Sequence, residues 1–320
     1  MIRIGVIGAG RHSRLEHGPA LAQYARQHPD AIECTAICDL DADRAARYAA
    51  EFGFERTYTS VERMLDAETL DGLVAVTPME VTRSLVGELL TQRIPLLLEK
   101  PPGRTSAETR ALLEIAGRHD APHMVSFNRR FAPGVVRARA WLREHAADRS
   151  PRLVVARMLR HARREPHFIT ATSIHAIDTV LSLLGEPTRV VSRRDNIGRG
   201  QTCEASVAFH SGARAILLIT PDVGTLEETY EGYGDEYTIQ IDAMNRPGLE
   251  IFRRNDLVLS WRVAPNCPTA GRTGTLGETE AFVEAVRGQG AYWPTLTDAL
   301  WTMKVAEAAQ RGGETVLSQA

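Results

Sequence analysis

The sequence predicts an α/β protein with two domains, an N-terminal doubly wound parallel sheet and a second domain built around an antiparallel meander. Over residues 1–127, short apolar strands alternate with helices, as in a parallel sheet with crossover helices. After residue 130, strand-like runs separated by turn residues replace that alternation. A chain of 320 residues is also long for one hydrophobic core. We therefore predict domains at 1–127 and 128–320, with the C-terminal helix packing back on the first.

Composition argues against several classes of partner. The net charge of −2 and the pI of about 6.6 give no electrostatic reason to expect nucleic acid or an anionic membrane. No apolar stretch approaches the roughly 20 residues of a membrane span, and Met1 leads directly into a strand without a signal-peptide core. Cys34 and Cys38 would lie about 13 Å apart along one strand, which is too far for a disulfide. Reduced thiols predict a cytoplasmic protein.

The first predicted element is a strand over residues 2–7 that runs directly into Gly8-Ala9-Gly10. Glycines here let the backbone turn tightly and approach a pyrophosphate, which N–H groups of the next helix can bind. That helix is predicted over 15–27, and Ser13 replaces a usual third glycine while still allowing close helix packing. We assign five residues of this stretch to cofactor binding: Gly8, Gly10, Arg11, His12 and Ser13.

The second predicted strand, 34–38, ends at Asp39. A carboxylate at this point can accept from both ribose hydroxyls of an adenosine and would repel a 2′-phosphate. Asp39 therefore predicts NAD rather than NADP as the cofactor, although Arg44 on the next helix can soften that preference. The alternative is an N-cap role for Asp39 at the helix over 42–51, and the two roles are compatible.

The alternation of strands and helices continues to the end of the first domain. A helix follows Thr77-Pro78 and runs through Leu90, and another is predicted over 106–119. The remaining strands of this domain are predicted at 73–76, 96–98 and 124–127.

The strand over 96–98 delivers two charged residues to the edge of the sheet. Leu96-Leu97-Leu98 reads as a buried parallel strand, and Pro101 and Pro102 stop it immediately after Glu99 and Lys100. Open α/β sheets bind ligands at the carboxyl ends of their strands. An ammonium held against apolar side chains can have a lowered pKa and can pass a proton to a substrate oxygen. The alternative is a solvated charge pair that only ends the strand.

The second domain begins with a predicted connecting helix over 133–145 and a strand over 152–159. An amphipathic helix follows over 173–184, and two helices, 278–287 and 297–310, finish the chain. Between them we predict strands at 189–193, 204–210, 214–220, 237–241, 249–252 and 257–261.

Across nearly its whole length the chain resembles the Gfo/Idh/MocA oxidoreductase family. The resemblance is carried by Gly8-Ala9-Gly10 with His17 beyond it, Asp39, Thr77-Pro78, Glu99-Lys100-Pro101, Phe127-Asn128-Arg129-Arg130-Phe131 and His175-Ala176-Ile177-Asp178. It implies a Rossmann domain, a C-terminal α/β domain with a large, open, mainly antiparallel sheet, and nicotinamide-dependent redox chemistry on a sugar, polyol or related molecule.

The resemblance also implies roles for particular residues. Lys100 would sit beside the nicotinamide and donate to the substrate oxygen, and His175 would be a second proton-transferring group facing the same substrate. Glu99 would help to hold the nicotinamide ribose. Cofactor binding is further assigned to Thr77, Pro78, Lys100 and Asn128.

One departure from the family pattern concerns the catalytic constellation. The family's dehydrogenases usually carry Asp four residues before the catalytic His, and this chain has Ala171 there and Ser173 where a glycine is usual. Asp178 lies three residues after His175, on the same helix face, and is our candidate for a partial substitute. Thr170 or Thr172 can contribute a hydroxyl, and Thr82 stands near a position where the family usually has His.

Basic residues precede the His175 helix and predict an anionic group on the substrate, because the planar arginine fork suits carboxylates and phosphates. The alternative is a solvated strand end and loop. Histidines 161, 167 and 175 match no common zinc spacing, so we assign no metal. Substrate binding is assigned to Arg160, His167, Thr172 and Tyr233. The wider basic cluster also contains Arg157, His161, Arg163 and Arg164, and Tyr230 is a further pocket candidate with sheet packing as its alternative.

Three functions follow from this interpretation. The first is an NAD(P)-dependent oxidoreductase acting on a carbinol or carbonyl carbon of a carbohydrate-like molecule. The second is a dinucleotide-binding relative that has lost its chemistry, for which Ala171 is the best support. The third is a redox-neutral enzyme with tightly held NAD. An apolar face on the predicted meander further predicts a homodimer or homotetramer.

Overall fold

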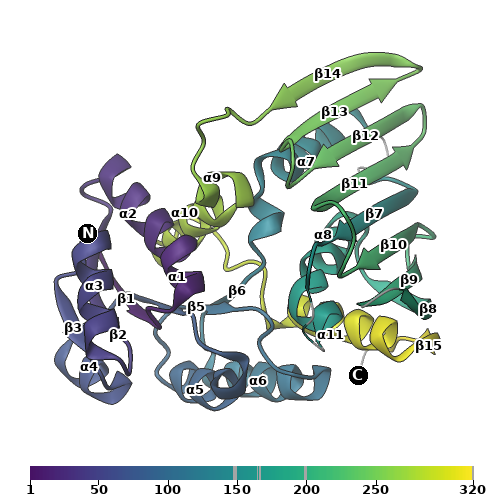
Figure 1. Ribbon diagram of the computed structural model, residues 1–320. Coiled ribbons are helices and arrows are strands. Elements are labelled where there is room, and N and C mark those ends of the chain that lie inside the picture. Colours follow the sequence, from purple (N-terminus) through teal and green to yellow (C-terminus); the bar gives the residue numbers. More distant parts are fainter. Residues whose placement is uncertain (147–149, 164, 166, 198–199, 319–320) are drawn as a thin grey trace. The chain divides into compact units, whose positions relative to one another are not determined.

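The computed structural model describes residues 1–146, 150–163, 165, 167–197 and 200–318, and they form two compact units (Figure 1). Unit 1 contains Met1–Asn128 and Pro268–Ala299, and unit 2 contains Arg129–Cys267 and Leu300–Ala320. A stretch from the last sixth of the chain therefore belongs with the N-terminal residues. The division into domains at 1–127 and 128–320 stays a proposal. No helix among the described residues is long and apolar enough to cross a membrane.

Unit 1 is built on a six-stranded parallel sheet with the order β3-β2-β1-β4-β5-β6. This order reverses direction between β1 and β4, the switch point of a doubly wound sheet, beside which such folds bind dinucleotides. The predicted fold class of the first domain is thus confirmed. The strands are β1 (Ile2–Ile7), β2 (Ile32–Cys38), β3 (Arg56–Tyr58), β4 (Gly72–Ala75), β5 (Leu96–Glu99) and β6 (His123–Ser126).

Three helices of unit 1, α3, α4 and α6, begin at a residue whose side chain caps the first turn. Asp41 caps the first turn of α3 by accepting from the Arg44 N–H, and Thr105 caps α6 in the same way. Gly53 ends α3 in the left-handed conformation with φ +80°. The helices are α1 (Arg11–Leu15), α2 (His17–Gln27), α3 (Ala42–Phe52), α4 (Val61–Ala67), α5 (Met79–Thr91), α6 (Ser106–His119), α9 (Thr269–Thr273) and α10 (Thr275–Val286).

The prediction of one continuous helix over 15–27 is wrong. The helix breaks at Glu16, whose φ of −123° and ψ of −68° are not helical. The Glu16 carboxylate accepts hydrogen bonds from Thr273 (2.7 Å) and Thr275 (2.9 Å). Both threonines come from the segment 268–299, far from Glu16 in the sequence. The helical periodicity of residues 15–27 therefore gives no sign of the break at Glu16.

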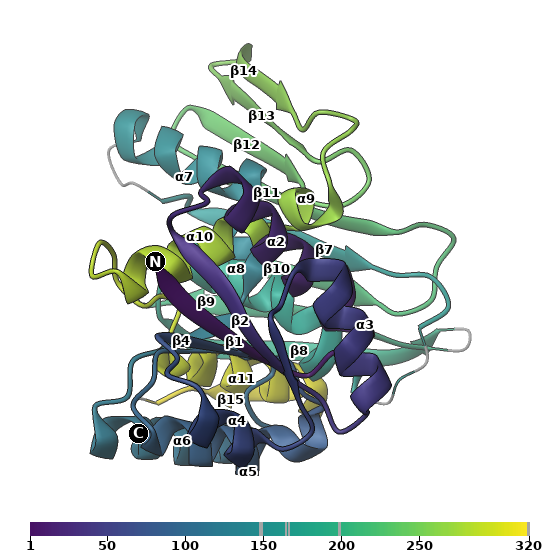
Figure 2. The same ribbon diagram turned by 90° about the vertical axis from the view of Figure 1, so that its left-hand side faces the viewer.

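The segment 268–299 packs against the rest of unit 1 through α10, and Figures 1 and 2 both draw α10 beside α2. Ser126, the last residue of β6, donates to the buried carboxylate of Glu278 on α10 (2.8 Å). The Val125 N–H donates to the Pro294 carbonyl (2.8 Å). The edge strand β6 is therefore anchored by this segment.

Unit 2 is built on a nine-stranded sheet with the order β14-β13-β12-β11-β7-β10-β9-β8-β15. β7 and β10 run parallel and all other neighbours run antiparallel, which confirms the mainly antiparallel sheet. Among the elements of the described residues, β3, α4, β11, α9 and β15 were not predicted. The strands are β7 (Leu153–Leu159), β8 (Pro187–Ile197), β9 (Gly200–Phe209), β10 (Arg214–Thr220), β11 (Glu227–Gly234), β12 (Tyr237–Asp242), β13 (Gly248–Arg253), β14 (Asp256–Arg262) and β15 (Gly313–Val316).

One face of this sheet is covered by helices and holds the core of unit 2. Alternate residues of β7, such as Val154, Ala156 and Met158, are fully buried there, while their neighbours are half-buried on the opposite, open face. A π-helix over Ile169–Ser173 leads into the helix that carries His175. A 3₁₀ turn (Asn128–Phe131) begins at the last residue of the first stretch of unit 1 and leads into unit 2. The α-helices of unit 2 are α7 (Pro133–His145), α8 (Ile174–Leu184) and α11 (Leu296–Arg311), which begins in unit 1.

Candidate dinucleotide and proton-transfer site

The loop after β1 requires glycine at its first position. Gly8 has φ +100°, and a Cβ atom there would lie 2.1 Å from the Val76 carbonyl oxygen. Nothing lies within 4 Å of the position that a Cβ of Gly10 would occupy, so that residue faces open space. The tight turn and the open approach are what a dinucleotide pyrophosphate needs at this point.

Asp39 holds this loop from the end of β2. One oxygen of its carboxylate accepts from the Ala9 N–H (2.8 Å), and the other accepts from the Asp41 N–H (3.0 Å) and from Arg44 (3.4 Å). The alternative N-cap role for Asp39 is wrong, because Asp41 caps α3. The ribose-binding role of Asp39 stays a prediction, and Arg44 lies close enough to weaken the repulsion of a 2′-phosphate.

A concave pocket of 470 Å³ opens beside the glycine loop. Its charged lining is strongly positive, which suits the diphosphate and adenosine part of a dinucleotide. Arg11 and Arg47 make no hydrogen bond or ion pair with a described residue, whereas Arg14 pairs with Glu51 (2.5 Å). The lining residues are Ala9, Gly10, Arg11, Arg14, Leu15, Arg44, Arg47 and Glu51.

Ser13 faces inward from α1. It is fully buried, and its hydroxyl is hydrogen-bonded to the Tyr48 hydroxyl of α3 (2.8 Å). This contact supports the packing role of Ser13, which stands in place of the usual third glycine. The predicted contact of Ser13 with the cofactor stays a prediction without structural support. Burial raises the pKa of Tyr48, so its phenol remains neutral.

Glu99, at the end of β5, is buried and held by three donors. One carboxylate oxygen accepts from His12 Nε2 (2.9 Å) and His17 Nε2 (2.8 Å), and the other accepts from the Lys100 N–H (2.9 Å). Burial alone would raise the pKa of Glu99, but His12 and then His17 hold it well below its usual value. Glu99 is therefore ionised. An ionised carboxylate only accepts hydrogen bonds, so both imidazoles carry their proton on Nε2.

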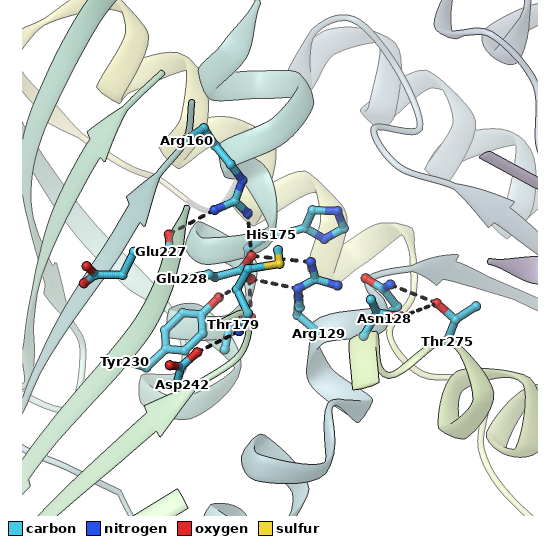
Figure 3. Close-up of polar contacts among 12 residues, drawn as sticks. Asn128, Arg129, Arg160, His175, Thr179, Glu227, Glu228, Tyr230, Asp242 and Thr275 are labelled. Atoms are coloured by element: carbon cyan, nitrogen blue, oxygen red, sulfur yellow. Dashed lines mark hydrogen bonds and ion pairs between the residues drawn. The ribbon is translucent and has the colours of Figure 1, made fainter. Parts of the chain in front are cut away.

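Two further strand ends contribute to the same edge of unit 1. Thr77, after β4, shares a hydrogen bond with the buried Thr82 (3.1 Å), and Pro78 is the N-cap of α5. Asn128, after β6, donates from Nδ2 to Thr275 (3.0 Å; Figure 3). Its buried Oδ1 atom makes no hydrogen bond with a described residue. An orphaned acceptor of this kind fits a ligand amide or hydroxyl.

In unit 2, the Asp178 candidate lies in a buried ion pair. Arg130 donates to both of its oxygens (2.7 Å each), and Thr302 donates to one of them (3.1 Å). The Asp178 side chain has no exposure to solvent. This geometry supports a role in tying α8 to the 3₁₀ turn and α11. A catalytic role for Asp178 stays a prediction without structural support.

Sequence reasoning missed a second buried charge network, centred on Glu228 of β11 (Figure 3). Arg129 (2.8 Å) and Arg160 (2.6 Å) both donate to the Glu228 carboxylate, as does the Tyr230 hydroxyl (3.0 Å). Burial would raise the pKa of Glu228, but Arg129 and Arg160 hold it below its usual value. Arg160 also donates to the Leu159 and Glu227 carbonyls. Its predicted contact with substrate therefore has no structural support.

The remaining substrate-binding candidates of unit 2 are not brought together. Tyr233 lies on the open face of the sheet, where it donates to Glu231, the ion-pair partner of Arg157. Thr172 donates to Glu165 (3.1 Å) and accepts from Arg163 (3.0 Å) near the start of α8. His161 and His167 are exposed, Ala171, Thr170 and Ser173 lie in the π-helix, and Arg164 falls outside the described residues.

The functional residues that the prediction missed leave little trace in the sequence. Glu228 is one glutamate among several on an unpredicted strand, and only its burial distinguishes it. The alternation of β11 sets Glu228 and Tyr230 on the core face and Glu231 and Tyr233 on the open face. Prediction of that strand would have separated the two tyrosines.

Residues 2–127 match a family model described as an oxidoreductase family with an NAD-binding Rossmann fold, GFO_IDH_MocA. A D-apiose dehydrogenase from Paraburkholderia graminis is 29% identical over 92% of this chain and 85% of its own. An inositol 2-dehydrogenase from Corynebacterium glutamicum is 24% identical over 82% of this chain and 76% of its own. Levoglucosan dehydrogenase, solved with NADH and levoglucosan, has a TM-score of 0.85 at 19% identity, over 99% of this chain and 100% of its own.

Proposed function

We propose that this chain, whose residues 2–127 match the Gfo/Idh/MocA oxidoreductase family model, is an NAD-dependent dehydrogenase of carbohydrate-like substrates. The reaction moves a hydride between the nicotinamide and the carbinol or carbonyl carbon of a sugar, polyol or sugar derivative. Relatives named as D-apiose and inositol dehydrogenases support this substrate class.

The observation that carries the proposal is the carboxyl edge of the unit 1 sheet. The ends of three strands bring together the loop that requires glycine at position 8, the Asp39 carboxylate, and the pair Glu99-Lys100. The positive pocket beside the loop and the orphaned Oδ1 of Asn128 offer complementary charge and an acceptor to a dinucleotide. A nicotinamide bound at this edge supplies the hydride acceptor or donor.

We assign the accompanying proton transfer to Lys100, with His175 as a second group. When a carbinol is oxidised, its C–H electron pair leaves as hydride and its O–H proton must go to a base. Unprotonated Lys100 Nζ accepts that proton, and in reduction the ammonium returns it to the new alkoxide oxygen. Ala171 cannot accept a proton, and the Asp178 carboxylate is held by Arg130. We therefore assign the transfer of the substrate proton to Lys100 and His175.

The experiment is a screen of sugars, polyols and sugar acids with NAD⁺, followed by NADH absorbance. Turnover of at least one such compound, lost in Lys100→Ala, supports the proposal. NAD⁺ binding without turnover of any compound would favour the dinucleotide-binding relative. NAD that co-purifies and returns to its starting redox state in each cycle would favour the redox-neutral enzyme.

Assembly and location are further proposals. We propose a homodimer or homotetramer formed through the open face of the unit 2 sheet, because Val191 and Ile216 are exposed on that face. Light scattering at micromolar concentration tests this, and a monomer would contradict it. We propose a cytoplasmic location, in keeping with the free thiols of Cys34, Cys38, Cys203 and Cys267.

A further inference from the structure

His12 occupies a position that the proposed reaction does not explain. It lies in α1, two residues after Gly10, and its side chain is 51% exposed although Nε2 is engaged with the buried Glu99. The other ring nitrogen, Nδ1, makes no hydrogen bond with a described residue. His17, the second imidazole on Glu99, is 2% exposed. One partner of Glu99 is thus enclosed by protein, and the other is half-exposed to solvent.

The charged and titratable groups that face His12 come from two places. Glu99 and Lys100 lie at the end of β5, and Glu16 and His17 lie at the junction of α1 and α2. Glu99 dominates and raises the pKa of His12 above its ordinary value, Glu16 adds to this, and Lys100 opposes it. His12 therefore loses its proton at a higher pH than an ordinary imidazole does.

The three side chains form a hydrogen-bonded group. Both Nε2 atoms lie at hydrogen-bond distance from the same oxygen of Glu99, which requires an N–H on each imidazole. We assign no metal ion to them. When His12 is neutral, Nδ1 is a bare acceptor, and when His12 is protonated, Nδ1 becomes a donor that carries positive charge.

We propose that His12 is a positioning residue that couples dinucleotide binding to proton uptake. Through Nε2–H it holds the Glu99 carboxylate in place, and through Nδ1–H it donates to the diphosphate that the adjacent Gly8-Ala9-Gly10 loop binds. An imidazolium pairs with a diphosphate oxygen better than a neutral ring does, because the hydrogen bond is charge-assisted. Binding at a pH above the His12 pKa of the free protein therefore draws a proton onto His12.

This inference rests on the proposed function, because it assumes that the loop binds NAD. It predicts that NAD⁺ affinity falls as the pH rises above the His12 pKa of the free protein, by at most about tenfold per pH unit. At a pH below that pKa, His12 is protonated with and without cofactor, and affinity no longer depends on its titration.

The test is calorimetric titration of the full chain with NAD⁺ at about pH 6, 7, 8 and 9, in buffers of different ionisation enthalpy. The dependence of the observed heat on the buffer gives the number of protons taken up. The wild type should take up as much as about one proton per NAD⁺ at the pH values above the His12 pKa of the free protein and little at the pH values below it. His12→Gln keeps a donor for Glu99 but cannot titrate, so it should bind NAD⁺ without this uptake.

Two controls make the outcome specific. His119→Gln changes an exposed histidine at the end of α6 and should behave as the wild type. ADP-ribose carries the diphosphate without nicotinamide and should show the same uptake as NAD⁺. Uptake that persists in His12→Gln, or NAD⁺ binding to the wild type without uptake, would overturn the inference. Uptake with NAD⁺ but not with ADP-ribose would overturn the diphosphate contact. No NAD⁺ binding by the wild type would overturn the proposed function itself.

Discussion

Glu99 in unit 1 and Glu228 in unit 2 are both buried carboxylates held ionised by two nitrogen-rich side chains, yet they differ in what those side chains can do. Glu99 is held by two imidazoles, and one of them, His12, has a raised pKa and can gain or lose a proton. Glu228 is held by the guanidinium groups of Arg129 and Arg160, which stay charged at any pH at which the protein is folded.

The two carboxylates show that one chain can contain both a charge network that titrates and one that stays fixed. Glu99 precedes Lys100 at a strand end, and one of its partners faces solvent, so a ligand can change its surroundings. Glu228 has no exposure, and its partners are 7% and 5% exposed, so its network acts as scaffold.

The largest effect is expected at Lys100. Lys100→Ala removes the proposed proton-transfer group, and turnover should fall by about 10²–10⁴ or more, because a positioned acid or base typically contributes that factor. NAD⁺ affinity should stay within several-fold, and His175→Ala should be severely impaired. Steady-state kinetics and calorimetry on the same preparations measure both quantities. Turnover at the wild-type rate in Lys100→Ala would refute the mechanism.

The next effect concerns stability at Glu228. Glu228→Gln leaves two buried guanidinium groups without a neutralising charge and should lower the free energy of unfolding by about 3–5 kcal/mol. The matched control is Glu231→Gln on the same strand, which breaks a half-exposed pair with Arg157 and should cost about 0–1 kcal/mol. Urea denaturation followed by circular dichroism measures both. Equal losses in the two variants would contradict the scaffold role of Glu228.

The difference in affinity between NAD(H) and NADP(H) is expected to be smaller than the two effects above. Asp39 should make NAD(H) bind more tightly than NADP(H), because its ionised carboxylate repels a 2′-phosphate. Arg44, which lies 3.4 Å from Asp39, should reduce the margin, so Arg44→Ala should widen it. Calorimetric titration with both cofactors decides the matter, and tighter NADPH binding would refute the role given to Asp39.

The smallest effect is the pH dependence of stability from His12. Its pKa is raised in the folded protein, so its contribution is fully present below the ordinary value of 6.5 and is lost as pH rises through the raised value. The stability difference between wild type and His12→Gln should therefore shrink on going from about pH 6 to about pH 9. Glu228 gives no such change between about pH 6 and about pH 9. Because its pKa is lowered, the stability that its charge contributes is lost only as the pH falls into the acidic range. A difference that is constant with pH would argue against the contact of His12 with Glu99.

Local sequence patterns predicted most elements of the fold. The helix over 106–119 and the helix over 133–145 begin and end as predicted, because capping residues and apolar spacing act within a few residues. The break at Glu16 and the anchoring of β6 by residues 268–299 could not be predicted in this way. Both depend on hydrogen bonds between residues more than 100 positions apart.

By itself, the sequence determined the alternating α/β order of the first domain, the glycine loop, and the strand ends that present Asp39 and Glu99-Lys100 to one edge of a parallel sheet. These follow from backbone geometry, which repeats with the local period of a strand or helix. Only the tertiary structure decided which charged groups meet. Glu99 meets His12 and His17 across more than 80 residues, and Glu228 meets Arg129 across 99. Burial, and with it the strength of each charge interaction, is a property of the packed chain, so no local pattern in the sequence encodes it.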